Sequence, residues 1–251
     1  MSGHSKWATI KHKKAALDAK RGKVFSRISK EITLAAKQGG GDPDMNPRLR
    51  TAVLAGKAAN MPADNIDRAI KKGTGELPGV VYEEIMYEAY GPAGVGVLIQ
   101  VVTDNRNRAA SEVRATLERR GAKMANAGAV SYQFQKKGLI TVDKAVTNED
   151  AIFMTVTEAG AEDLKTLADT YEIISPFEAF EDVKRALETA SIKTTSAELT
   201  MLPAATVKVT AEKDASSLLK LLEAIEDLDD VQNVYSNFDM DETLMQKVSA
   251  E

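Results

Sequence analysis

The sequence predicts an α+β protein with an N-terminal helical domain and two α+β domains, the second ferredoxin-like and inserted into the first. Three observations predict this. Apolar residues recur at helical spacing up to about residue 75, and beyond it they alternate with period 2. A complete strand-helix-strand-strand-helix-strand order then interrupts a second α+β pattern. The predicted domains are 1–75 (a basic arm and three helices), 76–135 plus 204–251, and 136–203.

The first helix is predicted to be amphipathic. A wheel at about 100° per residue gives it a cationic face made of Lys20, Lys23, Arg27, Lys30 and Lys37. The opposite face is apolar and consists of Val24, Phe25, Ile28, Ile32, Ala35 and Ala36. Because exposed charges contribute little to stability, we expect the cationic face to be thermodynamically neutral.

Two further helices complete the N-terminal domain. Asn46 and Pro47 supply a cap and a first-turn residue for the second helix. The third is predicted to start near Pro62 and to end at Gly73, where a linker to Gly79 begins.

The discontinuous α+β domain is predicted to open with strands 82–90 and 95–103, joined by the turn Gly91-Pro92-Ala93-Gly94. A helix over 105–120, capped by Thr103 or Asp104, and a short strand over 130–134 follow. The missing half of this domain is expected near the C-terminus, as strand 206–210, helix 215–228 and strand 231–235.

The inserted domain has the ferredoxin-like order of elements. These are strand 138–142, helix 149–159, strands 163–167 and 171–175, helix 177–190 and strand 197–202.

Charge is distributed unevenly along the chain. Residues 1–72 hold sixteen Lys and Arg against six Asp and Glu, and the remainder holds seventeen against thirty-one. The formal net charge of −4 therefore combines a basic N-terminal part of about +10 with an acidic remainder of about −14.

Composition excludes several classes of protein. The chain has no Cys, which removes disulfides, thiol catalysis and Cys-based zinc sites and fits a reducing cytoplasm. The longest apolar run, around Val95 to Val102, is too short for a membrane helix, and the first residues lack the apolar core of a signal peptide. We therefore expect a cytoplasmic protein without a membrane partner.

Cations crowd the first residues. Lys6, Lys11, Lys13, Lys14, Lys20 and Arg21 are opposed only by Asp18 and surround Trp7, His4 and His12. A Lys/Arg stripe on one helix is ordinarily a solvated face, but such crowding is self-repelling, and a polyanion relieves it. The predicted nucleic-acid-binding residues are Lys6, Trp7, Lys11, His12, Lys13, Lys14, Lys20, Arg21, Lys23, Arg27, Lys30, Arg48 and Arg50.

Catalytic and cofactor sites find little support. His4 and His12, the two histidines, lack the partners of a metal or general-base site. The run from Gly91 to Gly96 precedes a strand and reads as a hairpin turn rather than a dinucleotide loop, and no phosphate-binding loop motif occurs. Three acids near the first strand, Glu83, Glu84 and Glu88, have no evident nucleophile or metal partner. We expect no catalytic residues, no metal and no cofactor, hence not an enzyme.

The segment Thr103-Asp104-Asn105-Arg106-Asn107-Arg108 has two interpretations. Its Asp and Asn side chains suit capping of the following helix. Arg106, Arg108 and Arg114 equally suit phosphate near a positive helix end.

Several long blocks carry a family resemblance. GHSKWATIKHKKAALDAKRGKVFSRISKEI, GGGDPDMNPRLRTAV, KAANMPADNIDRAIKKGTG, YEAYGPAGVGV and TDNRNRAASEVR resemble the YebC/PmpR family, which includes the mitochondrial translational activator of cytochrome oxidase. The resemblance runs nearly end to end. It implies a three-domain, non-enzymatic regulator of gene expression, either a DNA-binding transcriptional regulator or a ribosome-associated translation factor.

The leading hypothesis is therefore a nucleic-acid-binding protein whose basic part binds DNA or ribosomal RNA, while the acidic α+β domains meet protein partners. Trp7 suits stacking on an unpaired base. On the first helix only Ser26 and Ser29 are short polar side chains able to read bases, and the abundance of lysine favours recognition of backbone or shape. An enzyme and a protein-interaction scaffold are the competing classes.

Overall fold

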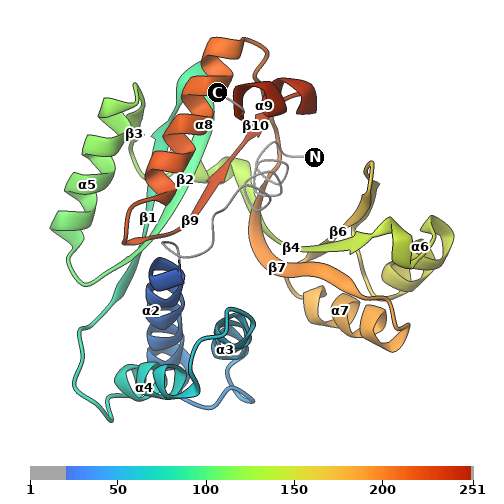
Figure 1. The fold of residues 1–251 in the computed structure, drawn as a ribbon, viewed down its shortest axis with the longest axis horizontal. Coiled ribbons are helices and arrows are strands. Elements are labelled where there is room, and N and C mark those ends of the chain that lie inside the picture. Colours follow the sequence, from blue (N-terminus) through green and yellow to red (C-terminus); the bar gives the residue numbers. More distant parts are fainter. Residues whose placement is uncertain (1–20, 250–251) are drawn as a thin grey trace. The chain divides into compact units, whose positions relative to one another are not determined.

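The structure, a computed structural model, describes residues 21–249 (Figure 1). It divides into two compact units. Residues 132–206 form one, here called the inserted unit, and the other described residues, 21–131 and 207–249, form the larger unit. The described chain begins with three helices and continues with two regions that each combine a sheet with helices, which confirms the predicted fold class. Because the N-terminal helices belong to the larger unit, the finer division into three domains stays a prediction.

Three helices begin the larger unit: α2 (Arg21–Gly39), α3 (Pro47–Ala58) and α4 (Ala63–Thr74). The core between them contains Ile32, Ala35, Ala36, Leu49, Ala52, Val53, Ile66 and Ala69. Asn46 caps α3 as predicted, since its Oδ1 accepts a hydrogen bond from the Leu49 N–H at 3.1 Å. Its Nδ2 also donates to the carbonyls of Ala35 and Gly40, which ties α2 to α3.

The predicted end of α4 at Gly73 is wrong. The helix continues to Thr74, and Gly75 follows it in the left-handed conformation at φ +84°. At Gly73 a Cβ atom would lie 2.4 Å from the carbonyl oxygen of Thr33. The first glycine therefore permits the close approach of α4 to α2, and the second ends the helix.

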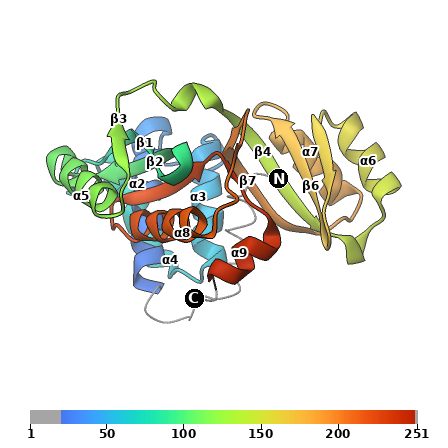
Figure 2. The same cartoon turned by 90° about the horizontal axis from the view of Figure 1, so that it is seen from above.

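The sheet of the larger unit has strand order β3-β1-β2-β9 and is antiparallel throughout. Its strands are β1 (Glu83–Tyr90), β2 (Gly96–Thr103), β3 (Lys123–Ala125) and β9 (Val231–Ser236). Two helices, α5 (Arg106–Arg119) and α8 (Glu212–Glu226), share a core with it (Figures 1 and 2). That core includes Val97, Ile99, Val101, Val113, Leu117, Leu218, Leu222 and Ile225.

The turn between β1 and β2 forms as predicted, as a short 3-10 helix (η1, Pro92–Gly94). The predicted strand over 130–134 is wrong, because β3 precedes it and a second 3-10 helix (η2, Ser131–Gln133) takes its place. The backbone N–H groups of Val130 and Ser131 donate to the Glu88 carboxylate, so they are unavailable for strand pairing.

The C-terminal part of the larger unit also departs from expectation. The strand predicted over 206–210 is the short β8 (Val207–Lys208), which pairs in parallel with β10 (Phe238–Asp239) in a sheet of its own. Neither β10 nor the final helix α9 (Glu242–Ser249) was predicted. Apolar residues of the segment 238–248 nevertheless join the core, namely Phe238, Met240, Met245 and Val248.

The inserted unit confirms the ferredoxin-like order. Its elements are β4 (Phe134–Asp143), a 3-10 turn η3 (Lys144–Val146), α6 (Glu149–Glu158), β5 (Asp163–Thr166), β6 (Thr170–Pro176), α7 (Phe180–Thr189) and β7 (Thr194–Pro203). The sheet has order β5-β6-β4-β7 with antiparallel neighbours. The two helices pack against the sheet, and the shared core contains Ile140, Val142, Ile152, Ile173, Val183 and Leu187.

The inserted unit begins and ends at one place. Phe134 at the start of β4 pairs with Pro203 at the end of β7. Just outside this pair, the Ala204 N–H donates to the Gln133 carbonyl at 2.8 Å. The chain thus enters and leaves this unit through neighbouring residues. Within residues 21–249, no helix has the length and apolar character needed to cross a membrane.

Candidate nucleic-acid interface

Part of the predicted interface lies outside the described residues, namely Lys6, Trp7, Lys11, His12, Lys13, Lys14 and Lys20. For these the interface stays a prediction. Of Arg21 only the backbone, at the start of α2, is described.

Lys23, Arg27 and Lys30, here called the basic stripe, follow one another along one side of α2. All three contact residues 226–230, here called the acidic loop, which connects α8 to β9 (Figure 1). Lys23 donates to the carbonyl of Asp227, and Arg27 donates to the carbonyl of Glu226. These side chains are partly buried, so the expected solvated face is wrong for the stripe.

Lys30 makes the shortest ion pair of the stripe. Its Nζ lies 2.6 Å from Oδ1 of Asp230 and 3.0 Å from the carbonyl oxygen of Asp229. Lys23 adds a longer ion pair, 3.4 Å from Nζ to Oδ1 of Asp227. The apolar face of the wheel is also narrower than predicted, since Val24 is 41% exposed.

The position of the acidic loop explains why it attracts cations. The last carbonyls of a helix have no partner within it and carry the negative end of the helix dipole. The last turn of α8 holds no basic residue, and Asp227, Asp229 and Asp230 follow it. Burial lowers the pKa of Arg27, whereas the charges of Glu226, Asp227 and Asp229 raise it, and burial prevails.

Asp230 is the most buried acid of the loop, at 6% exposure. Besides Lys30, its carboxylate accepts hydrogen bonds from Nη2 of Arg108 and from Oγ1 of Thr103, each at 2.8 Å. Burial raises the pKa of Asp230, but the bonds from Lys30, Arg108 and Thr103 outweigh it and leave the pKa below its ordinary value. Asp230 therefore joins α2, β2 and α5.

The segment 103–108 performs the capping role, with a different residue from the one expected. Asn105 caps α5 by accepting from the Arg108 N–H at 3.1 Å. Arg108 pairs with Asp230 and with Asp104, and both interactions raise its pKa. Arg106 and Arg114 are exposed, so for them a phosphate contact stays a hypothesis.

Arg48 and Arg50 also have partners within the larger unit. Arg48 pairs with Glu31 at 2.7 Å and with Glu84 at 2.9 Å. Burial lowers the pKa of Arg48, but its bonds to Glu31 and Glu84 raise it further, so the net shift is upward. Arg50 donates to the carbonyls of Pro43 and Asp44 and so supports the turn before α3.

The three acids of β1 have separate environments. Glu88 is buried, and its carboxylate accepts from the N–H groups of Gly128, Val130 and Ser131 at 2.7, 2.5 and 2.9 Å. Glu84 binds Arg48 and Gln100, and Glu83 is exposed. Nothing in this arrangement resembles a pair of carboxylates sharing a substrate. Among the described residues, no group of three or more His, Asp or Glu is placed to hold a metal ion.

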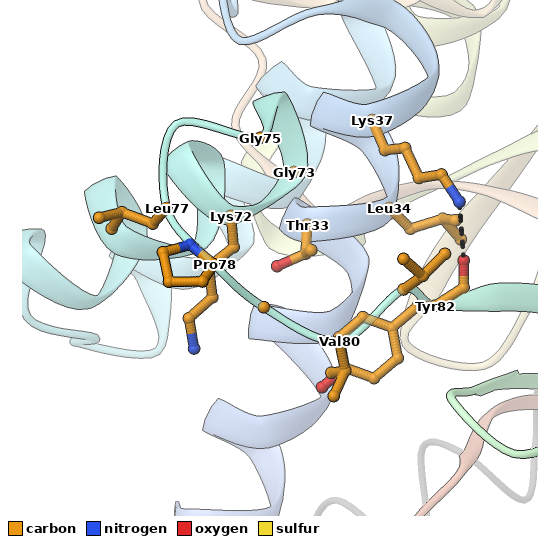
Figure 3. Close-up of a pocket in the computed structure, with 12 residues that line it drawn as sticks. Thr33, Leu34, Lys37, Lys72, Gly73, Gly75, Leu77, Pro78, Val80 and Tyr82 are labelled. Atoms are coloured by element: carbon orange, nitrogen blue, oxygen red, sulfur yellow. Dashed lines mark hydrogen bonds between the residues drawn. The ribbon is translucent and has the colours of Figure 1, made fainter.

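A pocket of about 310 Å³ lies where the linker after α4 crosses α2 and α4 (Figure 3). Its walls are largely apolar and include Leu34, Leu77, Pro78, Val80 and Val81. Lys37 and Lys72 also line it, and Lys37 donates to the carbonyl of Tyr82 at 3.5 Å. The lining contains no carboxylate or histidine, which makes it a poor site for acid-base chemistry.

Two family models match the chain. One describes the TACO1/YebC N-terminal domain and matches residues 5–76; the other describes the TACO1/YebC second and third domains and matches residues 82–238. The chain belongs to the YebC/TACO1 family. The resemblance drawn from the sequence blocks is thereby confirmed.

Curated members of the YebC/TACO1 family match along their whole length. A protein of Geobacter sulfurreducens named as a probable transcriptional regulatory protein is 56% identical over 248 residues, covering 99% of this chain and 100% of the relative. One of Syntrophobacter fumaroxidans, with the same name, is 53% identical over 249 residues, with the same coverage. The crystal structure of a conserved hypothetical protein from Aquifex aeolicus is 43% identical, with a TM-score of 0.81 over 90% of this chain and 93% of that one.

The acidic loop of this YebC/TACO1 member escaped the sequence analysis, although a signal for it exists. Asp227, Asp229 and Asp230 follow the end of an amphipathic helix, where negative charge is unfavourable. Such a run requires cations from elsewhere in the molecule, and the first helix has the largest supply of them. The anchoring role of Glu88 has no comparable signal, because its partners are backbone groups.

Proposed function

We propose that this YebC/TACO1 member is a nucleic-acid-binding regulator of gene expression that contacts the phosphate backbone through its basic N-terminal region. The observation that carries the proposal is the concentration of positive charge in residues 1–72 of an otherwise acidic chain. The names of the relatives, probable transcriptional regulatory proteins, support the regulatory role. In this proposal the protein acts in the cytoplasm, without catalytic turnover, and its acidic α+β parts meet protein partners.

The geometry of α2 supports a backbone contact. Lys23 and Lys30 are seven residues apart, which corresponds to about 10 Å along a helix axis. One strand of B-DNA carries a phosphate every 3.4 Å or so of its axis, so the stripe is on the order of three phosphate steps long. Contacts of this kind fix position and supply affinity, but they carry no sequence information.

The second candidate is a translation factor that binds ribosomal RNA. Only two short polar side chains of α2, Ser26 and Ser29, could read base edges in a major groove. Ser26 is exposed, but Ser29 is only partly exposed. Lysine-rich recognition of backbone and shape suits a structured RNA equally well. The two candidates share the basic surface and differ in the partner.

One binding experiment tests the proposal and separates the candidates. The full chain and a variant lacking residues 1–21 are titrated with random duplex DNA and with ribosomes over a range of salt. We expect log K to fall with log salt by about 0.7 to 0.9 per phosphate neutralised, and the truncation to lose most of the affinity. We also expect no DNA site to be bound about a thousandfold more tightly than random DNA, the least that site-specific regulators show.

Two results would count against these expectations. Affinity that is insensitive to salt would contradict the phosphate-backbone contact. A single DNA site bound at nanomolar strength against excess competitor, without ribosome association, would favour a strict DNA regulator over the translation factor.

A further inference from the structure

We infer that the acidic loop occupies the basic stripe of α2 as an internal substitute for phosphate, and that a polyanion binding to the stripe displaces it. The inference rests on the proposed function, because it concerns the regulation of the same surface. It makes the contact between α2 and the loop an autoinhibitory one.

The chemistry of the loop matches that of a nucleic-acid backbone. Each cation of the stripe donates to an oxygen of the loop: Lys23 and Arg27 to carbonyls at the end of α8, and Lys30 to a carbonyl and a carboxylate. The acceptors are anionic or belong to the negative end of a helix dipole. Phosphate oxygens would use the same donors, so the stripe cannot fully serve both partners at once.

The contact between α2 and the acidic loop, here called the joint, connects α2 to the sheet and is held by ion pairs and hydrogen bonds. The apolar cluster of the helices, which contains Ile32 and Leu49, shares no residue with the apolar cluster of the sheet within the described chain. Another contact between these parts, the pair of Arg48 and Glu84, is polar as well. Salt screens the more exposed ion pairs of this joint more strongly than the buried pair of Lys30 and Asp230. Opening the joint breaks these charge contacts without exposing a large apolar core.

The acidic loop does not supply an acceptor for every hydrogen-bond donor of the basic stripe. Nε of Arg27 is buried and, among the described residues, has no hydrogen-bond partner. A buried donor without an acceptor is costly. A phosphate group presents several oxygens to one guanidinium and can accept from two of its nitrogens, so it offers Arg27 a fuller set of bonds than a single carbonyl of Glu226.

The absence of Cys from the chain allows a direct measurement of opening. Spin labels are attached to Ser26→Cys on α2 and Glu223→Cys on α8, both exposed positions, and the distance between the labels is measured. We expect it to increase when salt is raised without nucleic acid. We expect the same increase when random duplex DNA is added at constant low salt.

A second measurement asks whether the loop competes with nucleic acid. Asp227→Asn together with Asp229→Asn removes two charges from the loop and leaves the stripe intact. The control, Glu158→Gln together with Glu188→Gln, changes net charge equally at exposed positions of the inserted unit. We expect the loop variant to bind the duplex more tightly than the control by about fivefold or more, which is the lower end of typical couplings between sites.

The outcomes separate the inference from the proposed function. If the duplex binds and the loop variant is no tighter than the control, the inference is wrong and the function stands. If no variant binds duplex DNA or ribosomes, the proposed function fails. An inter-label distance that then stays unchanged up to high salt overturns the inferred displacement of the acidic loop as well.

Discussion

Glu88 illustrates, at the scale of one residue, how a carboxylate fixes a loop. Three N–H groups of residues 128–131 donate to it. Burial raises its pKa, but these bonds outweigh burial and lower the pKa below the ordinary value. In the sequence Glu88 is one of three acids near the first predicted strand. Its role is set by partners some forty residues away, which no local pattern reveals.

The first prediction concerns this residue. Glu88→Gln replaces one carboxylate oxygen by an N–H donor, which faces backbone donors instead of accepting from them. We expect the free energy of unfolding of the larger unit to fall by about 1 to 3 kcal/mol, as for other buried groups left unpaired. Urea unfolding measures this. Glu83→Gln on the same strand is the control, since this acid is exposed; equal losses in the two variants would contradict the anchoring role.

At the scale of elements, the helices were predictable where their signals are local. The cap at Asn46 depends on residues close to it in sequence, and the structure confirms it. The end of α4 was misplaced because a glycine that ends a helix and one that admits a neighbouring helix look alike in sequence. Only the position of α2 distinguishes Gly73 from Gly75.

The second prediction tests this distinction. In Gly73→Ala the new Cβ would meet the Thr33 carbonyl at 2.4 Å, and backbone cannot yield as a flexible side chain can. We expect a loss of about 1 to 3 kcal/mol, typical of overpacking, measured by thermal unfolding. In the control, Gly22→Ala in α2, the new Cβ would meet no other part of residues 21–249 within 4 Å. The helix propensity of Ala should leave that variant unchanged or slightly stabilised. Tolerance of Ala at residue 73 would refute the close approach.

At the scale of the whole molecule, sequence reasoning identified the ferredoxin-like unit because its alternating elements are contiguous. It missed the joint between α2 and the acidic loop, whose partners are about two hundred residues apart. A helical wheel separates apolar from polar sides but does not say whether the polar side faces water or other charges. The candidate site was therefore recognised as basic, while the occupation of its described stripe was not foreseen.

The third prediction follows from the joint. Changing Lys23, Arg27 and Lys30 together to Gln should lower the free energy of unfolding by about 1 to 3 kcal/mol at low salt, because it removes two ion pairs and one hydrogen bond to a carbonyl at the end of a helix. Differential scanning calorimetry at low and high salt measures this, and we expect the difference to shrink as salt rises. The control changes the exposed residues Lys57, Arg68 and Lys72 to Gln. Equal effects of the two triple variants would restore the solvated-face interpretation.

The dependence of stability on pH tests the same contact between α2 and the acidic loop. The pKa of Asp230 is lowered in the folded protein, so its contribution is fully present above the unfolded value of about 3.9 and is lost as pH falls through the folded value. The stripe variant lacks part of this contribution. Its stability should therefore fall less steeply than that of the unchanged protein between about pH 5 and pH 2; parallel curves would show that Lys30 does not stabilise the ionised Asp230.

The meeting of the two ends of the inserted unit, at Phe134 and Pro203, has a consequence for the order of folding. Bringing together the ends of a flexible loop costs entropy that grows with the logarithm of its length, roughly 4 kcal/mol for the 75 residues from 132 to 206. An inserted unit that folds first has already met that cost, because its two ends are held together at Gln133 and Ala204. The chain that remains to be closed between β2 and β9 is then the 52 residues outside the folded unit rather than all 127 residues from 104 to 230.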